Sequence, residues 1–294
     1  MSKIFVIFTA LCLTQFSFAA KQIVLVPGFF SSAIPAPQTG GNPWKQPYFS
    51  QDIVQSISRN GDHVWVVDNL NPVGGIQENG ERLIQFLNQH LANLNDAEKS
   101  EQLILVAHSA GGLYSLYAAA HSDLPISRLI TLSTPFHGLN FLDNLEQAHL
   151  PLEALAAPFC LENLLGLRES SVQGFLSTVR IRRPLRMDVF AGYQPVGLMT
   201  WNFRVLSPPL VAFQVFIGEP SDGIVAVRSS MDASALTAQN PSLQLVIHPS
   251  PIALEHWELV VDSQMYRLIG VLNIEGLRRA QTQSYRDIFS ESGL

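Results

Sequence analysis

The sequence predicts an α/β protein with a mostly parallel central sheet and helices on both of its faces. Short apolar runs rich in β-branched residues alternate with helical periodicities along most of the chain. The runs are apolar on both sides, as expected for parallel strands that helices cover on both faces. Hydrophobic residues make up 47% of the chain and charged residues only 14%, so the chain can bury a large core.

The elements follow one another in a strand-then-helix order. The predicted strands are apolar runs bounded by turn residues, at 23–26, 63–67, 103–106, 129–132 and 187–192. Helical stretches stand between them, at 49–58, 83–94 and 113–120. Two later runs, 211–217 and 243–247, are also apolar, and the first of them fits a strand as well as a helix. Repetition of strand and helix implies a parallel sheet with right-handed crossovers.

The first nineteen residues have the features of a secretory signal peptide. Lys3 supplies a positive start, residues 4–13 are apolar except for Thr9, and Ser17-Phe18-Ala19 offers small residues at the cleavage spacing. The apolar run is too short for an ordinary membrane-spanning helix, although an N-terminal anchor is the alternative. We expect a secreted protein, extracellular or periplasmic, whose single domain covers residues 20–294.

The stretch from 139 to 180 departs from the alternating pattern. It holds many apolar residues but few strand signals, and Pro151 and Pro158 divide it into short pieces. Long connections in compact domains are often active-site lids. The sequence therefore predicts an inserted helical lid over 139–180, with an apolar face that includes Leu155 and Phe159. The alternative is that these residues are ordinary core.

The string Ala107-His108-Ser109-Ala110-Gly111 joins a buried strand to a helix through a tight turn. A serine at the tip of such a turn has a strained backbone, which exposes its hydroxyl above the sheet. The turn requires small residues two positions before and two positions after the serine. Ala107 and Gly111 meet this requirement, and Ser109 is the predicted nucleophile.

A nucleophilic serine needs N–H donors for the oxyanion that forms when it attacks a carbonyl. The amide of Ala110, directly after the serine, is one candidate, and the positive end of the following helix lies beside it. The second donor usually comes from the loop after an early strand. Val26-Pro27-Gly28-Phe29 has the form of a strand followed by a tight turn, and this predicts Phe29 as the second donor.

The order of the chain selects the other two members of a triad, which on this kind of fold follow the serine as acid and then histidine. His256 lies in a loop after the last apolar run, whereas His248 ends that run and fits a structural role better. Asp222 lies on a turn before Gly223, from which a carboxylate can reach an imidazole. Asp188 lies inside a strand, and Glu219 is the weaker alternative acid.

Taken in order, these motifs resemble those of the bacterial lipases of the α/β-hydrolase superfamily. The matched elements cover nearly all of the mature chain: 26–29, 107–112, Ser133-Thr134-Pro135-Phe136-His137-Gly138, 221–225 and His256. The resemblance implies the α/β-hydrolase fold and gives His137 a structural role beside the site. Ala107 departs from the commoner glycine. The calcium-dependent relatives have an aspartate two residues after the histidine. Here Glu258 stands at that place, and we expect it to be a solvated helix residue.

We therefore expect a serine hydrolase that cleaves carboxylic esters, in particular lipid esters, with Ser109, Asp222 and His256 as its triad and Phe29 and Ala110 as its oxyanion hole. The sequence gives no reason to expect a metal or another cofactor. The net charge of −6 gives no reason to expect nucleic acid as a partner, whereas transient contact with a lipid interface fits the low charge. A phospholipase or acyltransferase with the same triad, and a non-catalytic binding protein of this fold, are the alternatives.

Overall fold

The computed structural model describes residues 21–29, 48–58, 62–95, 98, 102–147, 164–195, 217–260 and 274–294. The segment assigned to a signal peptide lies outside this set, as do residues 148–163, which belong to the expected lid, and residues 211–216 of the ambiguous run. Those assignments stay predictions. None of the helices among the described residues has the length and apolarity needed to cross a membrane.

Among the described residues, six parallel strands form the sheet, in the spatial order β2-β1-β3-β4-β5-β6. They are β1 (Gln22–Val26), β2 (His63–Val66), β3 (Leu103–His108), β4 (Ile126–Leu132), β5 (Leu185–Phe190) and β6 (Leu243–Ile247). Every residue of β1 and β3 is buried, because these two strands lie inside the sheet with helices over both faces. The predicted parallel α/β class is confirmed.

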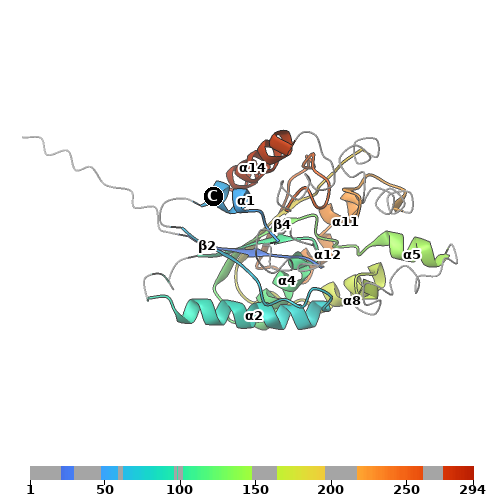
Figure 1. Ribbon diagram of the computed structural model, residues 1–294. Coiled ribbons are helices and arrows are strands. Elements are labelled where there is room, and N and C mark those ends of the chain that lie inside the picture. Colours follow the sequence, from blue (N-terminus) through green and yellow to red (C-terminus); the bar gives the residue numbers. More distant parts are fainter. Residues whose placement is uncertain are drawn as a thin grey trace, which may run out of the picture.

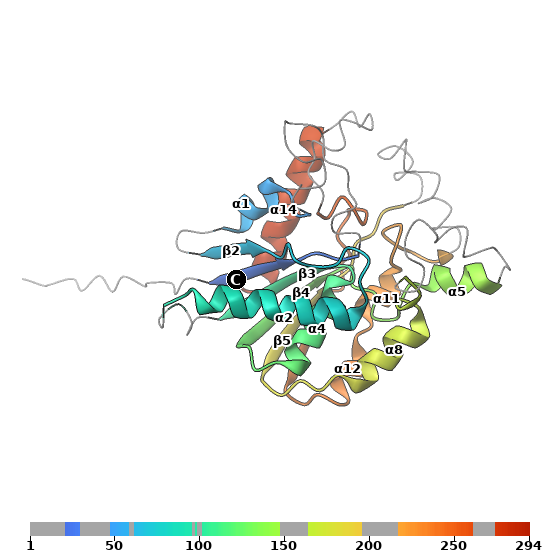
Figure 2. The same cartoon turned by 60° about the horizontal axis from the view of Figure 1, so that its bottom comes forward.

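Helices cover the two faces of the sheet (Figure 1). The described helices are α1 (Gln51–Ile57), α2 (Ile76–Ala92), α4 (Gly111–His121), α5 (Asn140–Gln147), α8 (Glu169–Thr178), α11 (Val227–Met231), α12 (Ser234–Thr237) and α14 (Ile274–Glu291). Figure 2 shows α1 and α14 over one face and α2, α4 and α8 over the other. Each face has its own apolar cluster, so the sheet separates two halves of the core.

Helix α2 begins seven residues before the predicted start at Leu83, because its first two turns carry no apolar periodicity. Its N-cap is Gly75, and polar residues and Gly80 occupy most of these turns. The apolar face that the sequence reveals then begins with Leu83, Phe86 and Leu87, all of which are buried. The buried Asn79 side chain accepts a hydrogen bond from the Asn71 N–H and donates one to the Gly74 carbonyl, and hydrophobic periodicity cannot detect such contacts.

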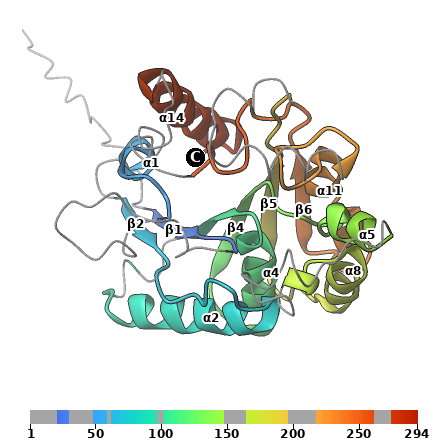
Figure 3. The same ribbon diagram turned by 45° about the vertical axis from the view of Figure 1, so that its right-hand side comes forward.

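The described ends of the expected lid segment are packed on the body of the domain. Helices α5 and α8 lie side by side (Figure 3), and the Leu139 N–H donates to the Leu167 carbonyl at 2.7 Å. Their apolar side chains, including Leu142 and Val172, belong to the core cluster on the α4 face. Leu155 and Phe159, which would form the lid face, lie outside the described residues.

Candidate active site

Ser109 lies at the turn between β3 and α4 with a backbone φ of 55°, in the left-handed region. A residue other than glycine pays about 1–2 kcal/mol for this conformation. Hydrogen bonds to neighbouring strands hold it there. The Ser109 N–H donates to the Leu132 carbonyl at 2.8 Å, and the Thr134 hydroxyl donates to the Ser109 carbonyl at 2.9 Å. The strained turn that the sequence predicts is therefore present at Ser109.

Two glycines allow the turn after β1 to pack closely against the turn that holds Ser109. A Cβ added to Gly28 would lie 2.6 Å from the Ser109 Cβ and 2.8 Å from the His108 carbonyl oxygen. A Cβ added to Gly111 would lie 2.5 Å from the Val26 carbonyl oxygen. Neither position can hold a larger residue unless the backbone moves. The loop that carries Phe29 thus packs directly against Ser109.

We expect Gly28→Ala to lower both the free energy of unfolding, by about 1–3 kcal/mol, and esterase activity, because the new methyl group meets backbone that cannot move away freely. Gly174→Ala is the matched control. It lies inside α8 with no atom within 4 Å of the added Cβ, so we expect stability to rise by about 0.5–1 kcal/mol with activity unchanged. Chemical denaturation and ester hydrolysis measure the two effects. Equal changes in stability and activity in Gly28→Ala and Gly174→Ala would contradict the close packing of Gly28 against Ser109.

The two predicted oxyanion donors come from adjacent strands. β1 and β3 are neighbours with Val26 opposite Ala107, so the residues that follow each strand emerge side by side. Ala110 is the N-cap residue of α4 and is fully buried, and the first N–H groups of a helix have no partners within it. Phe29 follows Gly28 and is also buried. The structure places both residues beside Ser109.

Asp222 and His256 are in direct contact. The Asp222 Oδ2 lies 2.8 Å from the His256 Nδ1, and both side chains are buried. The other carboxylate oxygen, Oδ1, accepts hydrogen bonds from the N–H groups of Ile224 and Val225 at 3.0 and 2.8 Å. The His256 N–H also donates to the Asp222 carbonyl at 2.9 Å. These bonds fix the carboxylate and orient the imidazole with its Nδ1 toward Asp222.

Ser109 and His256 both lie at the carboxyl ends of the strands. The ring of His108, which is bonded to Ser109 in the chain, has its centroid 4.5 Å from that of the His256 ring. Because His108 directly precedes Ser109, the His256 ring lies near the turn that holds the serine, although no hydrogen bond joins Ser109 and His256 among the described residues. The structure therefore places the Asp222–His256 pair near the carboxyl end of β3, where Ser109 begins the turn into α4.

The residues weighed as alternatives are engaged elsewhere. The Arg186 guanidinium donates two hydrogen bonds to the buried Asp188 carboxylate, which also contacts the His248 ring at 3.1 Å. The Glu219 carboxylate accepts a hydrogen bond from Asn140 at 3.0 Å and pairs with an arginine of α11. The His137 Nε2 contacts an aspartate carboxylate at 3.0 Å. None of these contacts includes Ser109 or His256.

The expectation that Glu258 is solvated is wrong. Its side chain is 2% exposed, and the carboxylate accepts a hydrogen bond from the Glu255 N–H at 3.1 Å. In turn, the Glu255 carboxylate accepts a hydrogen bond from the Glu258 N–H at 2.7 Å. Burial, together with the nearby Glu258 carboxylate, raises the pKa of Glu255 well above its usual range. The chain folds back in a turn at His256, and this reciprocal capping removes both side chains from water.

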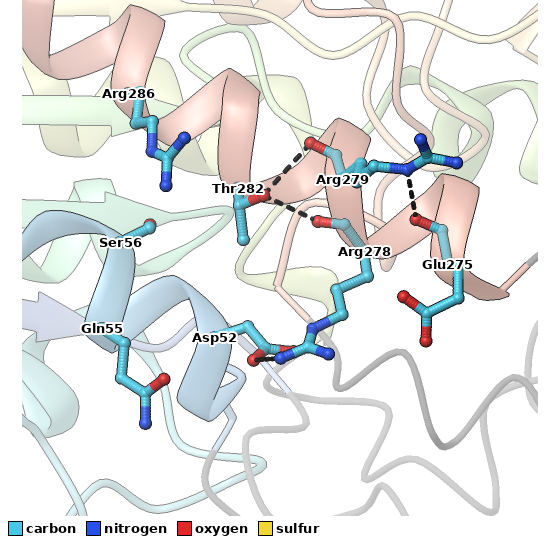
Figure 4. Close-up of a pocket in the computed structure, with 8 residues that line it drawn as sticks. All are labelled: Asp52, Gln55, Ser56, Glu275, Arg278, Arg279, Thr282 and Arg286. Carbon is cyan, nitrogen blue, oxygen red and sulfur yellow. Dashed lines mark hydrogen bonds and ion pairs between the residues drawn. The ribbon is translucent and has the colours of Figure 1, made fainter.

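A cavity of about 320 Å³ opens between α1 and α14, away from Ser109. Figure 4 shows Arg278, Arg279 and Arg286 along one side of it, with Asp52 opposite. The Arg278 guanidinium donates to the Asp52 carboxylate across the opening at 2.6 Å. No residue of the predicted triad or oxyanion hole lines this cavity, so it is separate from the candidate active site.

Comparison with known proteins agrees with this topology. A family model for the alpha/beta hydrolase fold matches residues 21–166. Triacylglycerol lipase 2 of Saccharomyces cerevisiae is 26% identical over 165 residues, which cover 53% of this chain and 49% of the yeast protein. The match thus spans about half the length of this curated relative.

Several solved structures share the fold at low sequence identity. A metagenomic carboxyl esterase has a TM-score of 0.64 at 17% identity, with 95% of this chain and 77% of that chain covered. A Bacillus licheniformis lipase in its mature form gives 0.54 at 20% identity, covering 90% and 92%. A Staphylococcus hyicus lipase gives 0.58 at 10% identity, covering 93% and 97%. The sheet topology, the family match and these structural relatives together establish that the chain has the α/β-hydrolase fold.

Proposed function

We propose that this protein hydrolyses carboxylic esters through an acyl-enzyme intermediate on Ser109. The observation that carries the proposal is the buried contact of 2.8 Å between Asp222 and His256, at the edge of the sheet where Ser109 occupies its strained turn. A histidine oriented by a carboxylate beside a serine is the arrangement that activates a hydroxyl nucleophile. The named activities of the relatives, lipases and esterases, agree with it.

In the first half of the reaction, His256 removes the proton of the Ser109 hydroxyl as its oxygen attacks the ester carbonyl carbon. The carbonyl oxygen becomes negative and accepts hydrogen bonds from the amides of Phe29 and Ala110. Asp222 holds the imidazole in the required tautomer and stabilises the imidazolium. His256 then gives its proton to the departing alcohol oxygen, and the acyl group stays on Ser109.

In the second half, water replaces the alcohol. His256 takes a proton from the water as its oxygen attacks the acyl carbonyl, and the same two amides stabilise the second oxyanion. His256 returns the proton to the Ser109 oxygen as the acyl bond breaks. The products are one carboxylic acid and one alcohol, and the enzyme is restored.

A series of p-nitrophenyl esters from acetate to palmitate tests the proposed activity, with and without detergent. We expect release of p-nitrophenol well above the rate of the Ser109→Ala variant. A preference for the longer chains would identify lipid esters as the substrate class, in keeping with the low charge of the chain. Addition of a lipid alcohol separates hydrolysis from acyl transfer by the products formed. A purified, folded protein that cleaves none of the esters contradicts the proposal.

A further inference from the structure

Behind the candidate site lies a buried pair of polar side chains that the proposed reaction does not use. The Tyr48 hydroxyl oxygen lies 2.7 Å from the His108 Nδ1, although the two residues are 60 positions apart in the sequence. Tyr48 is 4% exposed and His108 is fully buried. Tyr48 belongs to the apolar cluster on the α14 face of the sheet, and the His108 ring contacts the Tyr48 ring. A polar contact in such surroundings is retained only where it is well satisfied.

Both members of the pair are neutral. Burial raises the pKa of the Tyr48 hydroxyl far above its ordinary value, and the Gly28 N–H opposes part of this rise. Burial also lowers the pKa of His108 well below its usual range, with the nearby His256 charge as the second cause. A neutral imidazole has one donor and one acceptor nitrogen. The Tyr48 hydroxyl can donate to the His108 Nδ1 only when the ring proton lies on Nε2, and this is the tautomer that we expect.

These contacts connect three parts of the candidate site. Gly28 directly precedes Phe29, and His108 directly precedes Ser109. The second ring nitrogen of His108, Nε2, is buried with no hydrogen-bond partner among the described residues, and the nearby His256 backbone opposes part of the fall in the pKa of His108. The rings of His108 and His256 lie 4.5 Å apart between centroids. Through His108, the pair thus contacts the turn that precedes Phe29, the turn that holds Ser109 and the loop that holds His256.

We propose that Tyr48 and His108 are positioning residues that hold the Gly28 turn, Ser109 and the His256 loop in register for ester cleavage. This inference rests on the proposed function. A neutral His108 also adds no positive charge beside His256, which must become an imidazolium during the reaction. Loss of the Tyr48 hydroxyl leaves the His108 Nδ1 buried without its partner, and the ring is then free to change tautomer or orientation.

Tyr48→Phe tests the proposal, because it removes one oxygen and keeps the aromatic ring. We expect kcat for a soluble p-nitrophenyl ester to fall about ten-fold with KM nearly unchanged, since neither residue is proposed to contact substrate. Tyr285→Phe is the matched control. Tyr285 is fully buried in the same cluster, and its hydroxyl has no hydrogen-bond partner in the described part of the chain. We expect its kcat to remain that of the wild type.

A double-mutant cycle separates positioning from general destabilisation. We expect His108→Leu to lower kcat at least as much as Tyr48→Phe, and the double variant to be no slower than His108→Leu alone. His108→Asn, which keeps an acceptor near the Tyr48 hydroxyl, should recover part of the lost kcat. Nitrogen-15 spectra of the histidine rings should show the Nε2–H tautomer for His108 in the wild type and a mixture in Tyr48→Phe.

An unchanged kcat in Tyr48→Phe while Ser109→Ala is inactive overturns the inference alone, and so do independent, additive effects of Tyr48→Phe and His108→Leu. Loss of kcat in Tyr285→Phe equal to that in Tyr48→Phe would also overturn it, since the effect would then be one of packing. A wild-type protein that cleaves no ester overturns the proposed function and this inference together. The tautomer of His108 is measured without any activity, so the structural part can be judged in either case.

Discussion

Replacing Ser109 or His256 with alanine is expected to lower kcat by about a million-fold, the size of the loss in enzymes with the same arrangement of groups. Without the Ser109 hydroxyl no acyl-enzyme can form. Without His256 no group is placed to take the serine proton, because the other ionisable group beside it, His108, is bound to Tyr48. The rates of ester release by the purified variants measure the loss.

Matched controls make this test specific. Ser115→Ala removes another buried serine hydroxyl, one that donates to the Gly111 carbonyl inside α4. His248→Ala removes the second late histidine, which contacts Asp188 and Glu291 instead of the site. We expect both controls to keep kcat within a few-fold of the wild type. Activity of more than about one percent in Ser109→Ala would show that the nucleophile is another residue.

The second large effect is expected for Asp222→Asn, which should lower kcat by about ten-thousand-fold. The amide can still accept hydrogen bonds from the Ile224 and Val225 N–H groups, so we expect the turn and the thermal midpoint to change little. An NH₂ group facing the His256 Nδ1 would favour the opposite tautomer, in which Nε2 carries the proton and cannot receive one from Ser109. Hydrolysis rates and thermal unfolding of the same preparation measure both effects.

Glu219→Gln is the control for this substitution. Glu219 was the alternative acid in the sequence, but its carboxylate contacts Asn140 and Arg228. We expect near wild-type kcat in Glu219→Gln. If Asp222→Asn were almost fully active and Glu219→Gln were not, the roles of the two carboxylates would have to be exchanged.

The fold could be predicted because its signals are local. Each of the first four strands is a run of four to seven residues with turn residues near its ends. The tight turn from Ala107 to Gly111 joins the end of a strand, a serine and the start of a helix in one short string. The order of the chain then narrowed the search for Asp222 and His256. The structure brings these two into contact across 34 residues. Their catalytic roles stay predictions.

The parts that the sequence did not reveal depend on contacts between distant segments. Tyr48 belongs to no motif of the sequence, and nothing near it in the chain indicates that its hydroxyl meets His108. His108 stands beside the serine in the sequence, but nothing in the motif assigns a role to its ring. Glu258 has the composition of a surface residue, yet the turn at His256 buries it against Glu255. Local periodicity carries no information about such partners.

The most direct test of the central claim is labelling of the purified protein with a fluorophosphonate, followed by mass spectrometry of its peptides. The account predicts one adduct, on the peptide that contains Ser109. It also predicts no adduct in Ser109→Ala and much slower labelling in His256→Ala and Asp222→Asn. Wild-type rates are expected in Ser115→Ala and His248→Ala. An adduct on another residue, or ester hydrolysis by a protein that the phosphonate does not label, would contradict the account.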